Sequence, residues 1–570
     1  MRQAAKALLS WRTLFGFGWF EATVMSLYCA VLAIAIPAHE PWSDEAQAWL
    51  LARDNTVWQM IRYRLHYEGA PPLWHVLLRL FHLAHGTYAG IGWFGAAFSV
   101  AGVYVLLRWS PFPLIVRALL PFSFFLQYQY AVIARSYNLF PLLVFSLSAL
   151  YPRKQKILWF ALVAGLLANI SLQGIECASI FSAFYCFDLY RSSRRGFPLR
   201  RPQLRFAALI FGILAGVACY AAVPAPDVNF AVTGTTGDGP VHKILVRFIG
   251  ETKPVYAKPP APGPYIPPQH EPAMPHLLSS PAGWAAWKIN HHEDGRPQPW
   301  PSAVAEFMVS IASQSAWPVA TSNVLACVFL LLLFAWLRAR RSLHLLLPWL
   351  SLMVVGQILW VADHHVGMIL IALLAAIWIA VERNPWPQPF TPLDIALTSV
   401  FALVVALQVG WSAVCISKDL RGNYDPGRET AAYLLQHPVG RTAAFNYWSV
   451  SMQPYFAGNP FFNIPTQYRI WSWNTDPDPY YQEVLAQHPD RIVYSAEFPG
   501  PGQMRNQWLP LNHVPTAEEQ RTLPWDQAIL YFHTHGYVET HRFCGTRFIR
   551  LSSSFTDCDL ILEPVGDPTE

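Results

Sequence analysis

Long apolar runs separated by short polar turns make up most of the chain as far as residue 413. Each run has about 16 to 22 residues, enough to cross a bilayer core because an α-helix rises about 1.5 Å per residue. The runs predict about eleven membrane-spanning helices, at residues 17–37, 89–107, 112–130, 136–150, 157–170, 172–190, 204–223, 318–337, 343–361, 364–381 and 392–413. The expected architecture is a polytopic α-helical membrane protein.

Two segments leave the topology open. Residues 71–85 begin with Pro71-Pro72 and contain Arg79, which favours a helix in the membrane interface; if the segment crossed instead, much of the later topology would invert. The first run could also be a cleaved signal peptide, because Ala33-Ile34-Ala35 resembles a cleavage site. The loop that follows lies outside the membrane in either case.

Lysine and arginine residues gather in alternate loops, which indicates the orientation of the spans. A cytoplasmic N-terminus places the basic clusters at Arg153, Arg340 and Arg383 inside and leaves few basic residues in the short outer loops. The chain is then a multi-pass protein of the cell (inner) membrane. Its larger outer loops are expected at about 38–88 and 224–302.

Residues 417–570 break the apolar pattern and are rich in Trp, Tyr and Phe. Alternating patterns predict two helices and two strands there, at 427–437, 516–531, 442–445 and 490–494. We therefore expect a transmembrane module over 1–416 and a C-terminal soluble α/β domain over 417–570 on the extracytoplasmic side.

Composition supports the membrane assignment. Of 570 residues, 53% are hydrophobic and only 13% are charged, which excludes an ordinary soluble protein. The basic clusters follow the topology and form no nucleic-acid-binding patch, so no nucleic acid partner is expected. Most cysteines lie in or beside apolar runs; an oxidising compartment would permit a disulfide between the other two, Cys544 and Cys558, though the sequence leaves their proximity open.

Trp42-Ser43-Asp44-Glu45 places two adjacent carboxylates just outside the first predicted span. Ser43 is a suitable cap for an amphipathic helix that continues to Trp58, and carboxylates in a first helical turn are favoured by the helix dipole. Simple capping is therefore one interpretation of the pair. The polar residues Arg53, Glu68 and His75 follow closely and favour a second interpretation, a chemical site.

The acidic pair and the later stretch Tyr67-Glu68-Gly69-Ala70-Pro71-Pro72-Leu73-Trp74 resemble the first outer loop of GT-C membrane glycosyltransferases. This superfamily includes protein O-mannosyltransferases (glycosyltransferase family 39) and the bacterial aminoarabinose transferases of lipid A. Ala70 stands where the usual turn of the family has histidine. The resemblance implies many spans, a large outer loop, an outer domain, and transfer of a sugar from a polyprenyl-phosphate donor to an acceptor hydroxyl.

That chemistry gives the candidate residues their expected roles. Asp44 is the expected base, and a single base opposite the leaving group predicts inversion. On a helix, the side chain of Glu45 points about 100° away from that of Asp44, and it could orient the acceptor, bind a divalent cation or cap the helix. The remaining candidates are Arg135, His364 and His365 for the donor phosphate, and Arg53, Glu68 and His75 for a lipid, glycan or protein acceptor.

Two other classes of function compete with this one. A flippase or transporter of lipid-linked saccharides predicts ionisable residues at mid-bilayer depth along several spans, whereas the charges here gather at the outer face. A non-catalytic membrane scaffold or sensor predicts no dependence of its function on Asp44.

Overall fold

A computed structural model describes residues 18–196, 201–223, 323–358, 365–387, 389–445, 447–464, 481–498, 525–550 and 553–565. These residues form two compact units. The helical unit contains the described residues of Met1–Ala38, Val57–Val223 and Ala305–Lys418. The tail unit contains His39–Thr56 and the described residues of Asp419–Glu570. The short segment that carries the acidic pair thus belongs with the C-terminal region.

The helical unit contains several helices that are long and apolar enough to cross a membrane. Among the described residues these are Trp19–Ala38 (α2), Tyr88–Trp109 (η2 with α7, Ile91–Trp109), Arg201–Ala222 (α12), Val366–Arg383 (α20) and Pro392–Asp419 (α21). Shorter apolar helices cover Leu73–Leu83, Ser136–Leu150, Val324–Ala339 and Leu343–Val355. The five long helices indicate association with a membrane; the expected total of about eleven spans stays a prediction.

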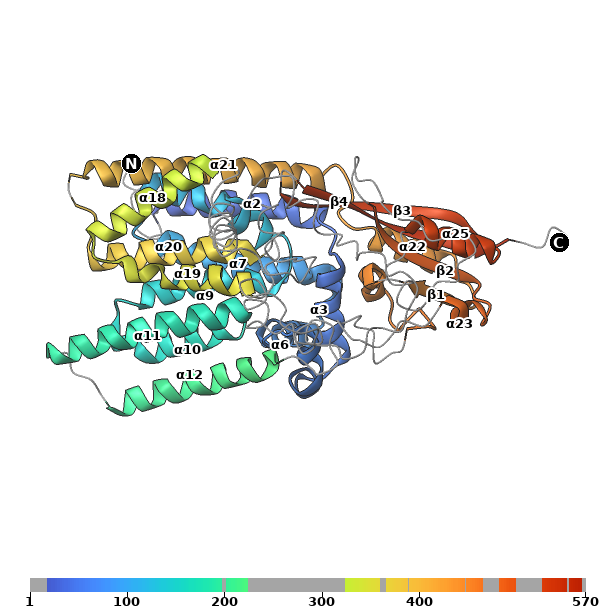
Figure 1. Cartoon of the computed structure of the whole chain (residues 1–570), viewed down its shortest axis with the longest axis horizontal. Coiled ribbons are helices and arrows are strands. Elements are labelled where there is room, and N and C mark those ends of the chain that lie inside the picture. Colours follow the sequence, from blue (N-terminus) through green and yellow to red (C-terminus); the bar gives the residue numbers. More distant parts are fainter. Residues whose placement is uncertain are drawn as a thin grey trace, which may run out of the picture. The chain divides into compact units, whose positions relative to one another are not determined.

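Burial differs strongly between these helices. The side chains of α20 are buried from Val366 to Val381, as expected for a helix that is apolar on all sides. By contrast, α12 is mostly exposed although it is equally apolar. It packs against α10 (Ile157–Ala168), which also contacts α11 (Leu172–Arg194), and Figure 1 shows the three side by side. Apolar side chains on the outside of such a helix suit contact with lipid.

The expected continuous helix over 112–130 is wrong. The chain forms α8 (Leu114–Leu119), a 3-10 turn (η3, Leu120–Phe122) and a π-helix (η4, Phe124–Gln129). Pro121 cannot donate a backbone hydrogen bond, and Ser123 is extended with ψ 154°. The irregular backbone is covered by other residues, which makes it tolerable inside a membrane protein.

The segment after Pro71-Pro72 forms α6 (Leu73–Leu83). Its 11 residues rise about 16 Å, roughly half of the bilayer core, so this helix is too short to span. The preceding helix α5 (Leu65–Glu68) ends at Gly69, whose φ of 58° lies in the left-handed region that glycine adopts without steric cost.

The tail unit is built on one four-stranded sheet in the order β1-β2-β4-β3. Its strands are β1 (Thr442–Phe445), β2 (Arg491–Phe498), β3 (Tyr537–Arg550) and β4 (Ser553–Pro564). Strands β1 and β2 are parallel, and the other pairs are antiparallel. The two predicted strands are confirmed as β1 and β2, whereas the long β3–β4 hairpin was not anticipated.

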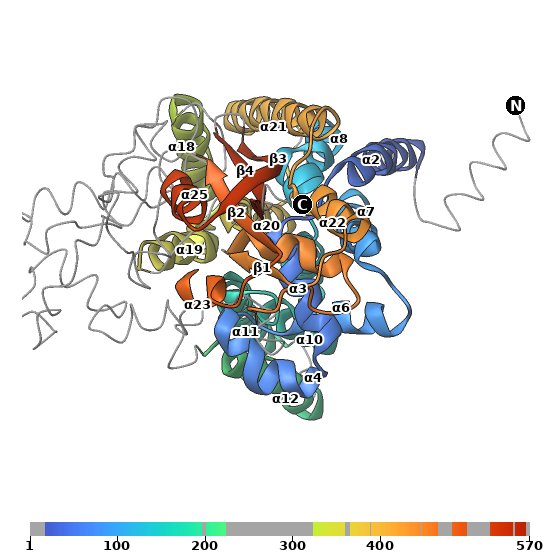
Figure 2. The same cartoon turned by 90° about the vertical axis from the view of Figure 1, so that its right-hand side faces the viewer.

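Helices cover both faces of this sheet, as Figure 2 shows for α22 (Gly427–Gln436) and α25 (Trp525–Thr534). Alternate residues divide between the faces: Phe445 and Tyr494 pack with the α23 (Tyr481–Leu485) and α25 side, and Val493 packs with the α22 side. The predicted helix 427–437 is confirmed as α22. The predicted helix 516–531 begins outside the described residues and corresponds to α25 in its described part.

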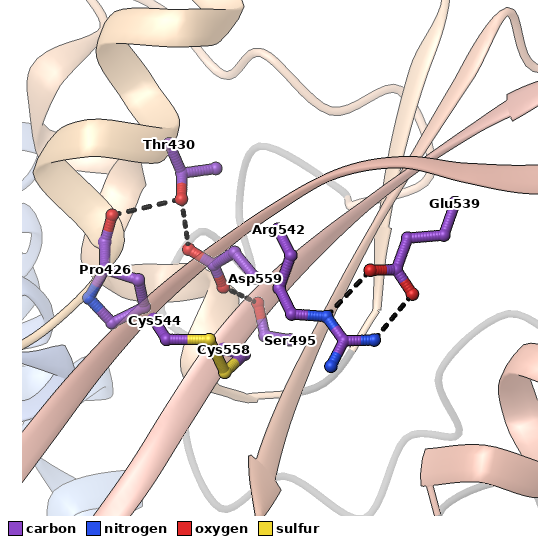
Figure 3. The surroundings of a disulfide bond; sticks show 8 residues. All are labelled: Pro426, Thr430, Ser495, Glu539, Arg542, Cys544, Cys558 and Asp559. Carbon is purple, nitrogen blue, oxygen red and sulfur yellow. Dashed lines mark hydrogen bonds and ion pairs between the residues drawn. A yellow bond between two sulfur atoms is a disulfide. The ribbon is translucent and has the colours of Figure 1, made fainter.

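A disulfide joins Cys544 on β3 to Cys558 on β4, and the two residues face each other in the ladder. The pairing that the sequence left open is therefore present. Beside it, Thr430 and Ser495 donate hydrogen bonds to the buried Asp559 carboxyl, at 2.7 and 2.5 Å (Figure 3). Burial raises the pKa of Asp559 to about 7.

Candidate active site

The two carboxylates lie in the first turn of α3 (Ser43–Asp54). The expected cap, Ser43, is instead the first residue of the helix, and its Oγ makes no hydrogen bond within the described part of the chain. The backbone N–H of Trp42 donates to Oε2 of Glu45 at 3.1 Å, which is one half of a capping box. Glu45 therefore caps the helix, and the expectation that Ser43 does so is wrong. Glu45 is the third residue of α3, and from that position its carboxylate reaches back to the free backbone N–H of Trp42.

Glu45 is also part of a buried charged triad. Its Oε2 lies 3.2 Å from Nε2 of His39, and Nδ1 of His39 lies 3.2 Å from Oδ2 of Asp419. Burial alone would lower the pKa of His39, but the two carboxylates outweigh burial and raise that pKa to about 10. His39 is thus an imidazolium at neutral pH, and each ring N–H donates to one carboxylate.

Further contacts attach this segment to the rest of the tail unit. The ring of His39 lies 4.5 Å from that of Tyr424, and Arg428 pairs with Glu40 at 3.5 Å. At the other end of α3, Nη1 of Arg53 donates to the backbone carbonyl of Phe456 at 3.0 Å. Most residues of α3 are buried, and the helix packs against η9 (Tyr447–Tyr455). The expected amphipathic surface helix is therefore wrong.

Asp44 differs from its neighbour. It lies in the same turn but is partly exposed, whereas Glu45 is 1% exposed and bonded to His39 and Trp42. Because adjacent helical residues point about 100° apart, the inward direction of Glu45 turns Asp44 toward another side. The structure thus gives the two carboxylates different surroundings.

A second cluster lies in the helical unit around Tyr137. The Tyr137 hydroxyl lies 2.8 Å from Nε2 of His365, and the guanidinium carbon of Arg135 lies 5.7 Å from the centre of the Tyr137 ring. Arg135 precedes the short 3-10 helix η5 (Ser136–Asn138), and the backbone N–H of Arg135 donates to Oδ1 of Asn138 at 2.7 Å. The turn therefore fixes the position of Arg135, and the charge of Glu68 also acts on Tyr137.

The charges in this cluster are unequal. Burial, assisted by the charge of Arg135, lowers the pKa of His365 to about 3, so the imidazole is neutral, and its Nε2 shares a hydrogen bond with the Tyr137 hydroxyl. Burial raises the pKa of Glu68 to about 7. Arg135 thus supplies the permanent positive charge in the cluster, and His365 orients Tyr137 instead of adding charge.

Not every predicted residue joins these clusters. His75 is buried on α6, and no described contact joins it to Tyr137; its Nδ1 makes no hydrogen bond within the described part of the chain. His364 lies outside the described residues. Asp44 and Arg135 belong to different units, so their convergence on one cavity stays a prediction.

Sequence reasoning missed His39, Asp419 and Tyr137. His39 and Tyr137 lie close to an end of a predicted span and Asp419 lies six residues beyond one, where an ionisable or hydroxyl-bearing residue indicates a partner nearby. No group of three or more His, Cys, Asp or Glu side chains in the described part of the chain is arranged to hold a metal ion. Comparison with known proteins finds no matching family, no matching curated protein and no matching solved structure.

Proposed function

We propose that the protein is a GT-C-type glycosyltransferase that passes a sugar from a polyprenyl-phosphate donor to an acceptor hydroxyl at the outer membrane face. One observation carries the proposal: the acidic pair is divided. Glu45 is buried by the His39 triad and caps α3, while Asp44 in the same turn stays partly exposed. A general base needs this combination of a fixed backbone and an accessible carboxylate.

The chemistry follows from these positions. The Asp44 carboxylate takes the proton of the acceptor hydroxyl while the acceptor oxygen attacks the anomeric carbon. The bond from that carbon to the phosphate oxygen breaks, and the polyprenyl phosphate leaves with its electron pair. Attack opposite the leaving group inverts the anomeric configuration. Arg135 is the proposed partner of the phosphate, because a fixed cation stabilises charge that develops on the leaving group.

The tail unit supports the outer location. A disulfide such as Cys544–Cys558 persists in oxidising compartments and is rare where thiols are kept reduced. The tail unit also contains the Asp44 segment. If the disulfide lies outside the cytoplasm, the Asp44 segment therefore lies outside it as well. This agrees with the orientation expected from the basic residues of the short loops.

The test is a transfer assay with the purified protein, a mixture of polyprenyl-phosphate sugars and a membrane extract as the source of acceptors. Asp44→Asn should lower transfer by about 100-fold or more, as expected for loss of a general base. Glu483→Gln, which neutralises an exposed carboxylate elsewhere in the tail unit, is the control and should keep wild-type transfer. Equal transfer by wild type and Asp44→Asn would reject the base.

A separate arm tests the class of function. Arg135→Met should lower transfer without changing the thermal stability of the tail unit. Absence of transfer by the wild type with every donor would reject the glycosyltransferase. Movement of the labelled donor across vesicles without transfer would favour a flippase.

A further inference from the structure

A lysine in the helical unit has a covered ammonium that makes no hydrogen bond within the described residues. Lys154 begins the short 3-10 helix η6 (Lys154–Lys156), between α9 (Leu139–Leu150) and α10. Its Nζ lies 4.2 Å from the ring centre of Tyr151 and 4.0 Å from that of Tyr185. Nζ is covered and makes no hydrogen bond within the described part of the chain. The two rings stabilise the cation but accept none of its protons in a conventional hydrogen bond.

The nearby carboxylate is already engaged. Oδ2 of Asp188, on α11, accepts a hydrogen bond from the Tyr151 hydroxyl at 2.8 Å and pairs with Arg383. Arg383 also donates to the Tyr151 oxygen at 2.9 Å. Within these described contacts, two cations share one carboxylate, which leaves one positive charge in excess. Burial lowers the pKa of Lys154 to about 8, consistent with an ammonium that lacks a full counter-charge.

The adjoining end of α11 has the composition of a membrane interface. Phe187 and Tyr190 are 59% and 53% exposed. The guanidinium carbon of Arg191 lies 5.8 Å from the centre of the Phe187 ring, and that of Arg194 lies 5.1 Å from the centre of the Tyr190 ring. Exposed aromatic rings with arginine heads beside them are typical of the level of lipid headgroups. The excess charge therefore lies near a surface suited to both the glycerol and the phosphate of a lipid.

We propose that Lys154, with Arg383, Tyr151 and Tyr185, binds the phosphodiester of one anionic phospholipid. A phosphodiester carries one negative charge, which matches the one excess positive charge of the cluster, and its oxygens supply the acceptor that Nζ lacks. Lys154 as a whole is partly exposed although its Nζ is covered, so a headgroup reaches the ammonium only when the covering side chains move aside. The exposed rings of α11 favour a lipid over free phosphate, and this site is independent of sugar transfer.

The test is native mass spectrometry of the purified, full-length protein titrated with phosphatidylglycerol, phosphatidylcholine or inorganic phosphate. Phosphatidylglycerol should bind the wild type in preference to phosphatidylcholine. Lys154→Met should weaken phosphatidylglycerol binding by about fivefold, the usual effect of one lysine near a lipid surface. Lys156→Met is the matched control, because Lys156 is exposed in the same turn, and it should bind within about twofold of wild type.

Two outcomes would overturn the proposal: unchanged phosphatidylglycerol binding by Lys154→Met, or an equal loss in Lys156→Met. Binding of inorganic phosphate that displaces phosphatidylglycerol at equal concentration would overturn the lipid assignment. A second measurement needs no variant. Phosphatidylglycerol should raise the Tm of the wild-type protein above its value in phosphatidylcholine, and equal Tm values would contradict the site.

Discussion

Each unit contains a histidine with a strongly shifted pKa, and the two shifts have opposite directions. His39 in the tail unit lies between two carboxylates, which raise its pKa to about 10. His365 in the helical unit lies beside Arg135 and Tyr137, and burial lowers its pKa to about 3. His39 is a cation that holds two anions together, and His365 is a neutral ring that shares a hydrogen bond with Tyr137. The neighbours, and not burial alone, decide the role of each ring.

The comparison also separates structural from chemical roles. The charge of His39 is balanced by Glu45 and Asp419, so this triad orders α3, whereas Asp44 is the proposed base. In the helical unit the neutral His365 adds no charge beside Arg135. Glutamine, which is neutral and keeps one acceptor and one donor, therefore tests both sites with the same substitution.

His39→Gln should have the largest effect. It removes the cation but leaves two buried carboxylates facing each other, and breaking a buried ion pair costs about 3–5 kcal/mol. Thermal unfolding and limited proteolysis of the tail unit measure the loss. His533→Gln, at an exposed position on α25, is the control. A Tm for His39→Gln equal to that of the control would contradict the triad.

The stability of the tail unit should also fall as the pH rises. The pKa of His39 is about 10 in the folded protein against 6.5 for an unperturbed histidine, so the folded state holds this proton more tightly. The resulting stabilisation is fully present below pH 6.5 and is lost as the pH rises through 10. Protease resistance measured across this range should decline in the wild type. A decline of the same size in His39→Gln would assign the effect to other groups.

Reduction of Cys544–Cys558 should destabilise the tail unit by about 3 kcal/mol, the usual effect of opening a loop of this size. The two cysteines are separated by 14 positions. Cys544→Ala with Cys558→Ala should lower the Tm of the tail unit. The helical unit provides the internal control, since its described cysteines are free thiols. Equal sensitivity of both units to a reductant would argue against a specific effect of the bridge.

His365→Gln should have the smallest effect. The glutamine amide, which has both a donor and an acceptor, can replace Nε2 as the partner of Tyr137, and no charge is lost because the imidazole is neutral. His365→Leu removes the hydrogen-bond partner of Tyr137 and should cost about 1 kcal/mol. Thermal unfolding in detergent should therefore rank Gln close to wild type and Leu below it. The reverse order would contradict a stabilising hydrogen bond between His365 and Tyr137.

Local features could be predicted from the sequence, and distant partnerships could not. Strand β1 and helix α22 follow from alternation and from helical periodicity within a few residues. The expected 112–130 helix failed because an apolar run does not reveal the effect of Pro121 on the backbone. The partners Tyr137 and His365 are 228 positions apart, and nothing local in either segment indicates the other.

The acidic pair shows the same limit. The sequence predicted that Asp44 and Glu45 would point in different directions, because adjacent helical residues always do. It could not show which one turns inward, because that depends on His39 and Asp419. The capping role was assigned to Ser43 for the same reason: propensity favours serine, whereas the tertiary contacts of Glu45 decide the actual geometry.

His39 and Asp419 are separated by 380 positions, although they belong to the same unit. At ordinary rates of protein synthesis, about 20 to 80 s pass between the appearance of the first and of the second. During that interval the Asp44 segment has been made but its charged partner has not. The order of synthesis therefore delays completion of the proposed active site until the membrane helices have been made, so a chain that stops before Asp419 cannot assemble it.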